Sequence, residues 1–349
     1  MAREAAFSVV VGGQNITTRL SPYLLSLSVT DKAGTTSDSC DISLDDKDGQ
    51  IAMPKVGAEM KVKLGWKDTG TVEVFVGKVD DVRATGARGG GRTMRITAKG
   101  LDTNSKAKEK QNKHIDKADL KKAMTDAGKG AGITDIKVDD ELAKITRDYW
   151  ALDGESFISF GQRVAREVGG TFRIRGNKAV IAKKGSGKSP SGKDLPTITG
   201  AYGDNLHTYD IAPVMGRPRQ KKVKARYYDR KEAKWKETEA EVEDEGAAAT
   251  ETKRHTVADE DEGKSRNRSD KADAETDKGG GSAEIEGDVR AMPEGKFVLT
   301  GARPGIDGTY RIEGVTHRYS KSSGFTTSLD LKLPVGPKSN GKKAASEKK

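Results

Sequence analysis

Residues 74–100 of the chain read VFVGKVDDVRATGARGGGRTMRITAKG and consist of two strand-like runs on either side of a glycine-rich turn. Apolar side chains recur at every second position in both runs, which is the period of a β-strand with one buried face. Glycine-rich turns of this kind join antiparallel strands. The stretch therefore predicts a β-hairpin whose apolar positions face a core, at Val74, Val76, Met94, Ile96 and Ala98.

Four earlier stretches show the same alternation, so the first hundred residues read as a series of short strands. Their apolar positions are Phe7, Val9 and Val11, then Leu25, Leu27 and Val29, then Cys40, Ile42 and Leu44, and finally Met60, Val62, Leu64 and Trp66. One apolar face per strand is what an antiparallel sheet curled around a single core requires. We therefore expect residues 1–104 to form a small antiparallel β-barrel or sandwich.

Residues 310–333 read YRIEGVTHRYSKSSGFTTSLDLKL and echo residues 74–100. Both stretches run strand, glycine, continuing strand, glycine-bearing hairpin and strand. Strand patterns of the same kind return from about residue 201. The economical interpretation is that two similar barrels, in residues 1–104 and 201–337, flank the middle of the chain.

The middle of the chain, residues 105–200, changes to a helical period. The stretch HIDKADLKKAMTDAGKG predicts a helix that begins at Asp116 and ends at Gly128. A second helix is predicted in DGESFISFGQRVAREVGG, followed by a strand, a tight turn at Gly176 and Asn177, and a returning strand. The predicted fold class is therefore mainly β with an α/β insert, or α+β overall.

Two polar segments lie outside these predicted cores. Residues 243–281 contain almost no large apolar side chain, and we expect either an exposed helix plus loop or a partly disordered, mobile segment of the second barrel. Residues 338–349 belong to the lysine-rich ending GPKSNGKKAASEKK and are expected to form a disordered tail.

The net charge of +10 suggests a basic nucleic-acid-binding protein as one alternative. However, Lys and Arg number 63 against 53 Asp and Glu, so the excess is a small difference between two large numbers. The basic residues are interleaved with acidic ones and lack an aromatic stacking platform, which favours a solvated surface. The single cysteine fits a reducing compartment, and no apolar run approaches the roughly 20 residues of a membrane span. We expect a soluble protein that is made in the cytoplasm and is not inserted in a membrane.

The stretch AVIAKKGSGKS, residues 179–189, ends like a phosphate-binding loop. In the pattern G-x-x-x-x-G-K-[ST], however, Ala182 stands where the first glycine is required. The mechanism also needs a helix directly after the lysine, because its N-terminal amides hold the phosphates. Pro190 and Pro196 follow instead. We interpret the stretch as a hairpin strand that leads into a linker, with no nucleotide cofactor.

No other pattern predicts catalysis, a cofactor or a metal site. The four histidines are widely separated and lack the partners of a zinc site: His114, His207, His255 and His317. The DDKDG turn at residues 45–49 lacks the ligand spacing of a calcium loop. Cys40 has no identifiable base beside it in its strand and is expected to be a buried thiol. The chain is therefore predicted not to be an enzyme.

The order of these segments resembles the phage late control protein D family. DISLDDKDG, VGAEMKVKLGW, VEVFVGKVDDVRA and MRITAKG are similar to the family's amino-terminal barrel. SFISFGQRVAREVGGTFRIRGNKAVIAKKG resembles its middle region, and GTYRIEGVTHRYSKSSGFTTSLDLKL resembles its carboxy-terminal signature. The resemblance covers most of residues 5–335 and depends on the whole series of segments.

The resemblance implies a non-enzymatic hub of a contractile-tail baseplate, located in the virion and assembled in the bacterial cytoplasm. In such hubs, two barrels per chain and three chains per ring form a pseudo-sixfold torus that adapts the sixfold tail tube to the threefold central spike. The implied partners are two further copies of the chain, the tail tube protein, the central spike protein, the tape measure and other baseplate proteins, with DNA only as cargo in the channel. We predict subunit contacts at the strands around Trp66, Phe75 and Phe325.

Three alternatives stay open. A hub of a phage-derived injection or secretion machine would share these sequence features, because the same module forms the base of type VI secretion spikes. A basic nucleic-acid-binding protein would bind DNA with a strong salt dependence. A peptidoglycan-cleaving baseplate enzyme would require a fused domain that the sequence does not show.

Overall fold

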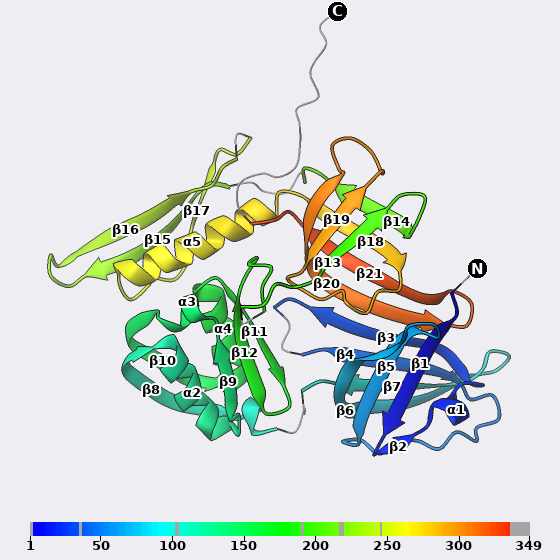
Figure 1. The fold of residues 1–349 in the computed structure, drawn as a ribbon. Coiled ribbons are helices and arrows are strands. Elements are labelled where there is room, and N and C mark those ends of the chain that lie inside the picture. Colours follow the sequence, from blue (N-terminus) through cyan, green and yellow to red (C-terminus); the bar gives the residue numbers. More distant parts are fainter. Residues whose placement is uncertain are drawn as a thin grey trace, which may run out of the picture.

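The computed structural model describes residues 3–34, 37–101, 105–189, 192–215, 220–244 and 246–335. Two parts lie side by side in Figure 1: a double β-sheet, and a smaller mixed α/β part called here the outer body. Both ends of the chain contribute to the double sheet, and segments between them form the outer body. The protein is thus mainly β with a helix-containing insert, as the sequence predicts.

The first half of the double sheet, called here the first lobe, contains residues 5–99. Its elements are β1 (Ala5–Val11), β2 (Gln14–Asn15), α1 (Thr17–Leu20), β3 (Leu24–Lys32), β4 (Ser39–Asp45), β5 (Glu59–Trp66), β6 (Gly70–Ala87) and β7 (Gly91–Lys99). The main strands lie in the order β3-β4-β7-β6-β5-β1, and neighbouring strands are antiparallel. Their alternating apolar positions face one core, in which Val9, Ile42 and Phe75 are fully buried.

The second half, called the second lobe, comes from the carboxy-terminal part of the chain. Its strands are β13 (Thr197–Ala201), β14 (Leu206–Ala212), β18 (Gly280–Glu286), β19 (Lys296–Thr300), β20 (Gly308–Ser320) and β21 (Gly324–Lys332). They lie in the order β14-β18-β21-β20-β19-β13, and only β13 and β19 are parallel. A separate core that contains Phe297, Ile312 and Leu329 fills this lobe.

The two lobes share strand order and register. The order β3-β4-β7-β6-β5-β1 corresponds to β14-β18-β21-β20-β19-β13, but the last strand runs in the opposite direction, because β1 is antiparallel to β5 whereas β13 is parallel to β19. The β4–β7 and β18–β21 pairs each contain seven consecutive residue pairs. The β6–β7 and β20–β21 hairpins each contain nine, interrupted once by a bulge at Asp80 and Glu313 respectively. The echo between residues 74–100 and 310–333 is therefore an echo of two equivalent hairpins.

Neither lobe closes into a separate barrel within the described ranges, which corrects the prediction of two barrels. The paired strands of the first lobe stop at β1 and its small partner β2, and those of the second stop at β14 and β13. The reason is β20, because its first half pairs with β19 and its second half pairs with β3 of the first lobe. The edge of β3 that a closed first barrel would need is occupied, and the lobes merge into one 13-stranded sheet.

The α/β insert forms one half of the outer body and has its own core. Its elements are η1 (Lys106–Lys108), β8 (Lys110–Asp119), α2 (Leu120–Ala131), β9 (Asp135–Val138), α3 (Asp140–Ala143), β10 (Thr146–Ser156), α4 (Phe157–Glu167), β11 (Gly170–Arg175) and β12 (Lys178–Lys183). Helix α4 packs on β11 and α2 packs on β9. The predicted helix, strand, turn and strand are all present, and the Ser156 side chain caps α4.

Helix α2 differs from the prediction at both ends. It begins after Asp119 rather than at Asp116, because the preceding ten residues pair with β10 as strand β8. It ends at Ala131, where Gly132 takes a left-handed φ of 73°. Gly128, the predicted end, lies inside the helix and is buried, so its lack of a side chain serves close packing rather than helix termination.

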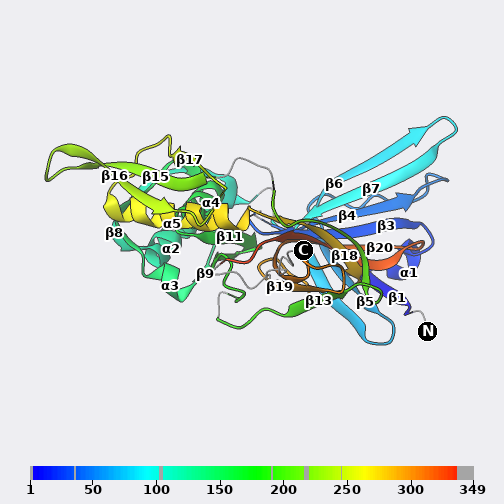
Figure 2. The same cartoon turned by 90° about the horizontal axis from the view of Figure 1, so that it is seen from above.

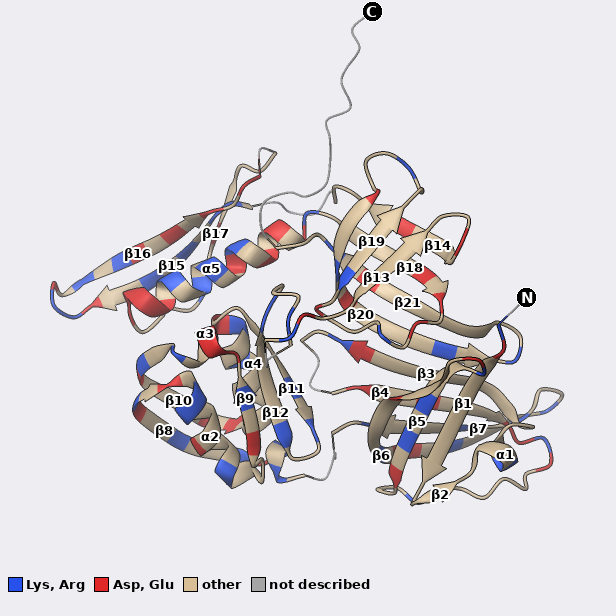
Figure 3. Cartoon of the chain, viewed as in Figure 1, with Lys and Arg blue, Asp and Glu red and all other residues tan. Residues whose placement is uncertain are grey.

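An arm inserted between β14 and β18 forms the other half of the outer body. It contains β15 (Gln220–Asp229), β16 (Lys234–Glu241), β17 (Ala249–Thr252) and α5 (Glu260–Thr276), and α5 packs against β15, β16 and α4. Lys–Glu pairs such as Lys222–Glu239 cross between β15 and β16, and basic and acidic positions alternate there in Figure 3. Residues 220–276 thus form a unit apart from the second lobe, and β17 and α5 lie in the polar segment 243–281.

Two polar segments and the membrane-spanning potential of the helices remain to be described. The predicted mobility of residues 243–281 in the isolated subunit stays a prediction, which limited proteolysis tests. Residues 338–349, predicted to be a disordered lysine-rich tail, lie outside the described residues. Each helix in the described ranges is too short or too polar to cross a bilayer.

Candidate functional site

The two lobes meet along β20. Its second half forms seven pairs with β3, from Gly314 with Lys32 to Ser320 with Ser26. Across this contact the hydroxyl oxygens of Thr30 and Thr316, which are 286 residues apart in sequence, lie 3.3 Å from each other. We call the contact between β3 and the β20–β21 hairpin the lobe junction, and it makes the double sheet continuous.

Two of the three residues predicted as subunit contacts lie at the lobe junction. The rings of Trp66 and Phe325 are 5.6 Å apart, and the Trp66 indole N–H donates to the Gly287 carbonyl at 2.9 Å. Gly287 approaches so closely that an added Cβ would lie 2.2 Å from the Phe325 ring. Trp66 is 8% exposed and Phe325 is 2% exposed. Their observed contacts therefore join the lobes within one chain.

The third residue, Phe75, is fully buried in the core of the first lobe. All three aromatic side chains are thus covered inside the chain, and a role for their strands between subunits stays a prediction. Other large apolar side chains are exposed to solvent in the described structure. They include Tyr202, Val214, Tyr228 and Trp235.

His317 is a buried histidine at the lobe junction. It is 6% exposed, and its Nδ1 lies 3.0 Å from the Thr327 hydroxyl. Burial lowers the pKa of His317 to about 4, although the nearby Asp288 carboxylate opposes part of this effect. The imidazole is therefore neutral at pH 7 and belongs to the packing of the junction.

Several strand edges of the double sheet have no partner strand in the part of the chain that the structure describes, and two of them are β14 and the second half of β6. β14 is the last strand of its lobe. From Asp81 to Ala87, the second half of β6 pairs with β7 on one side only. Figure 2 shows the β6–β7 hairpin running clear of the neighbouring strands, and residues 83–92 are all exposed. Such edges present unpaired N–H and C=O groups to another chain.

Ion pairs clasp the outer body to the first lobe. Arg173 and Arg175 of β11 both pair with Asp38, which is buried, and Arg173 also pairs with Asp31. Burial raises the pKa of Asp31, and the Arg173 guanidinium counteracts part of that rise. Because the two cores are separate clusters, polar contacts rather than a shared core hold these parts together.

A second clasp joins the outer body to the second lobe. The Glu294 carboxylate accepts hydrogen bonds from the Gly185 amide at 2.6 Å and from the Arg311 guanidinium at 2.8 Å. Glu294 and Arg311 are both buried. Burial raises the pKa of Glu294, with Arg311 acting in the opposite direction.

A buried carboxylate joins the two halves of the outer body. Glu167, at the end of α4, pairs with Arg147 at 2.7 Å, with Arg163 at 3.3 Å and with Arg266 of α5. Burial alone would raise the pKa of Glu167, but the surrounding guanidinium groups outweigh it and lower the pKa overall. The ionised carboxylate therefore fixes α5 against α4 and β10.

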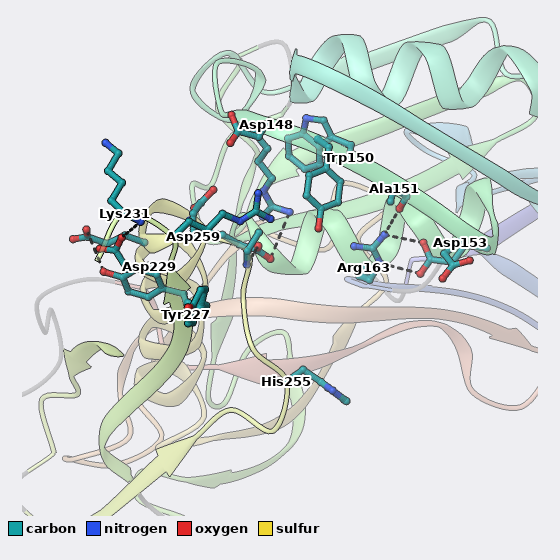
Figure 4. Close-up of a pocket in the computed structure, with 18 residues that line it drawn as sticks. Asp148, Trp150, Ala151, Asp153, Arg163, Tyr227, Asp229, Lys231, His255 and Asp259 are labelled. Atoms are coloured by element: carbon teal, nitrogen blue, oxygen red, sulfur yellow. Dashed lines mark hydrogen bonds and ion pairs between the residues drawn. The ribbon is translucent and has the colours of Figure 1, made fainter. Parts of the chain in front are cut away.

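A cleft of about 1100 Å³ lies between β10 and the arm. In Figure 4 its walls are the strand around Trp150 and the arm around Asp229. The Arg163 guanidinium in it is held at 2.8 Å by Glu155. Asp229 is held at 2.7 Å by Lys236. These charged groups pair with one another, so the cleft supports no catalytic assignment.

The GSGKS segment forms a loop that closes on itself. The Ser189 amide donates to the Lys193 carbonyl at 2.8 Å, and the Leu195 amide donates to the Gly187 carbonyl at 2.8 Å. The next described element is strand β13, where a phosphate site would need a helix. Backbone groups of the segment thus bond within the loop, in agreement with the linker interpretation.

The calcium-like turn at residues 45–49 and Cys40 have structural roles. Asp46 of the DDKDG turn accepts a hydrogen bond from the Ile51 amide at 3.1 Å. Cys40 is fully buried, and burial raises the pKa of its thiol. Among the described side chains, no three of His, Cys, Asp and Glu come together as a metal site.

Comparison with known sequences shows a match over most of the chain. Residues 36–323 match the family described as phage tail baseplate hub (GPD). A probable baseplate hub protein of Escherichia phage 186 is 29% identical over 208 residues, which are 59% of this chain and 52% of that protein. The chain therefore spans about half the length of the curated relative it matches.

Comparison with solved structures shows the same fold. The 43 kDa tail protein of prophage MuSo2 from Shewanella oneidensis is similar with a TM-score of 0.71 and 15% identity, over 95% of this chain and 98% of that one. An E. coli component of the type VI secretion system, described as similar to the T4 tail proteins gp27 and gp5, has a TM-score of 0.54 and 12% identity. That likeness covers 92% of this chain and 76% of the other, and at these identities both show the fold alone.

Proposed function

This chain belongs to the phage tail baseplate hub (GPD) family, and on that premise we propose that three copies form a pseudo-sixfold ring that joins the tail tube to the central spike. A sixfold tube cannot meet a threefold spike through identical contacts unless a part between them carries both symmetries. Two near-equivalent units per chain, repeated three times around a closed ring, satisfy both requirements.

The observation that supports the proposal is the shared topology of the lobes. Five strands follow the same order and direction in each lobe, and the central hairpins have the same register, down to the position of the bulge. Three chains carry six such lobes. The lobes face the tube in near-equivalent positions, while the outer bodies keep the true threefold symmetry of the ring.

The proposed setting is the virion baseplate, assembled in the bacterial cytoplasm. The partners are two further copies of the chain, the tail tube protein, the central spike protein, and the tape measure and other baseplate proteins. DNA passes the channel only as cargo. The fold likeness to a type VI secretion component favours one second candidate, a hub of a phage-derived injection or secretion machine.

The mass of the purified protein and the symmetry of the particle test the proposal. We expect a native mass of three chains of 37.5 kDa and, in a reconstruction of the particle, a threefold ring around a central channel. The two lobes should superpose on each other in that ring. A particle-bound monomer, or lobes in unrelated positions around the axis, would overturn the symmetry-adaptor mechanism even if the protein proved to be a tail component.

A further inference from the structure

We propose that β14 of one subunit pairs with the open edge of β6 of the next, so that the contact between subunits repeats the lobe junction inside each chain. The inference rests on the proposed function, because it takes the trimeric ring as its setting. It goes further by assigning two strand edges and one residue register to the subunit contact.

The registers of the two lobes define which strands are equivalent. β3 forms six pairs with β4 and β14 forms six pairs with β18, each with a register shift after the first pair. By these registers Ser28 corresponds to Asp210, and by those of the hairpins Arg318 corresponds to Thr85. Ser28 and Arg318 are opposite each other at the lobe junction. A repeated junction therefore places Asp210 of one subunit opposite Thr85 of the next.

Equivalent edges differ only in what covers them. The second half of β20 has β21 on one side and β3 on the other, whereas the second half of β6 has β7 alone among the described strands. Likewise β3 lies between β4 and β20, whereas β18 is the one described strand that pairs along β14, apart from an isolated bridge between Leu206 and Tyr202 at its start. An open edge is a template for strand addition, in which backbone hydrogen bonds give affinity and alternate side chains give specificity.

Side chains at the lobe junction are more buried than their equivalents on the open edges of β14 and β6. At the lobe junction Leu27 and Val29 of β3 are 0% and 1% exposed. Their counterparts on β14, Tyr209 and Ile211, are only half-buried. On the other side, His317 of β20 is buried, and its counterpart Ala84 on β6 is exposed. The positions that the junction covers within the chain are thus left open at the two free edges.

Side-chain volumes at the open edges are complementary. Within the chain, Leu27 is opposite Tyr319. The equivalent positions hold Tyr209 on β14 and Gly86 on β6. The aromatic residue is thus on the strand equivalent to β3, and the proposed register places it opposite a glycine. An aromatic side chain opposite a glycine covers the backbone that the glycine exposes.

Charge is complementary as well. Residues 82–101 contain no Asp or Glu, and Arg83 and Arg95 are directly opposite each other in the β6–β7 hairpin. Arg83 pairs with Asp81 at 2.6 Å and Arg95 pairs with Asp41 at 2.7 Å within the chain, yet both arginine side chains remain largely exposed. This basic edge can therefore accept a further anionic neighbour. The proposed register places Asp210 diagonally beside Arg83 of the next subunit, within reach of a long side chain.

Disulfide trapping tests the register directly. In the double variant Thr85→Cys with Asp210→Cys, mild oxidation of assembled particles should convert the hub into covalently linked trimers on a denaturing gel. The double variant Ser28→Cys with Arg318→Cys is the matched reference, because it bridges the observed equivalent pair within one chain. Thr85→Cys with Tyr209→Cys is the register control and should give no link, since the two side chains then lie on opposite faces. The native Cys40 is fully buried and does not compete.

A charge exchange provides an independent readout that does not depend on disulfide geometry. Arg83→Asp alone should weaken trimer formation by about tenfold, and adding Asp210→Arg should restore it, because the two charges attract across the contact. A particle that contains a threefold ring but shows neither the covalent trimer nor the charge rescue overturns this inference and leaves the proposed function standing. A hub that forms no threefold ring overturns both.

Discussion

The hairpins β6–β7 and β20–β21 are nearly the same piece of structure in two environments. Each has a bulge after its second pair, a three-residue loop, and a glycine in the left-handed region at the end of the loop, Gly91 and Gly324. One hairpin lies at the lobe junction under β3, and the other projects into solvent. The strand pattern therefore determines the geometry of each hairpin, whereas pairing with a further strand determines whether the hairpin is buried or exposed.

Side chains differ where the environments differ. Phe325 in β21 and Arg92 in β7 occupy equivalent positions next to the loop, and Phe325 is buried whereas Arg92 is exposed. Deeper in the hairpins, Leu329 and Ile96 are equivalent and both are buried. The two hairpins thus agree at these core positions and differ in burial next to the loop, where β3 covers the second half of β20.

The largest difference between the hairpins should come from truncating these two equivalent residues. Phe325→Ala removes a ring packed against Trp66 and Gly287, and we expect the free energy of unfolding to fall by about 3–5 kcal/mol. Arg92→Ala, its matched control, should change it by less than about 0.5 kcal/mol. Urea unfolding of both variants measures the contrast, and equal losses would show that the junction is not packed as described.

A pH-dependent loss of stability should follow from His317, which has no titrating counterpart in the projecting hairpin. Its pKa is about 4 in the folded chain and 6.5 in an ordinary environment, because burial disfavours the charged form. The unfolded chain therefore binds the proton first, so the contribution is complete above pH 6.5 and is lost as the pH falls through about 4.

The expected loss from His317 is about 3 kcal/mol across that window. His317→Gln removes the titration, so the difference in urea midpoint between wild type and variant should shrink steadily from pH 7 to pH 4. A difference that is independent of pH would mean that the imidazole is solvated and that the junction opens around it.

The sequence predicts the parts of this architecture that depend on local periodicity. Alternation around Val74 and Met94 locates the hairpin, and the echo at residues 310–333 locates its equivalent. The family resemblance stated from the order of segments is confirmed by the match over residues 36–323, and with it the prediction of a structural protein rather than an enzyme.

The parts that the sequence does not reveal depend on contacts between distant segments. Nothing in the local pattern of β3 distinguishes pairing with β1, which would close a barrel, from pairing with β20. The clasp of Arg175 on Asp38 and the pairing of Glu167 with Arg266 join charged residues that the composition presents only as a solvated surface. The strands around Trp66, Phe75 and Phe325 can be recognised in the sequence, whereas open strand edges are visible only once the strand order is known.

The smallest expected effect lies at the open edge itself. Thr85 and Thr93 are opposite each other in the projecting hairpin, with their hydroxyl oxygens 2.7 Å apart, and Thr85 is exposed. Exposed cross-strand pairs of this kind contribute a few tenths of a kcal/mol, because water replaces the lost hydrogen bond. Thr85→Ala should therefore lower the free energy of unfolding of the isolated subunit by less than about 0.5 kcal/mol. Urea unfolding of the monomeric form measures this, with Arg318→Ala as the reference at the equivalent position, where the side chain is also exposed but the strand pairs with β3. A loss above about 1 kcal/mol for Thr85→Ala would mean that another part of the same chain already covers β6, and the distinction between a covered and an open hairpin would fail at its open end.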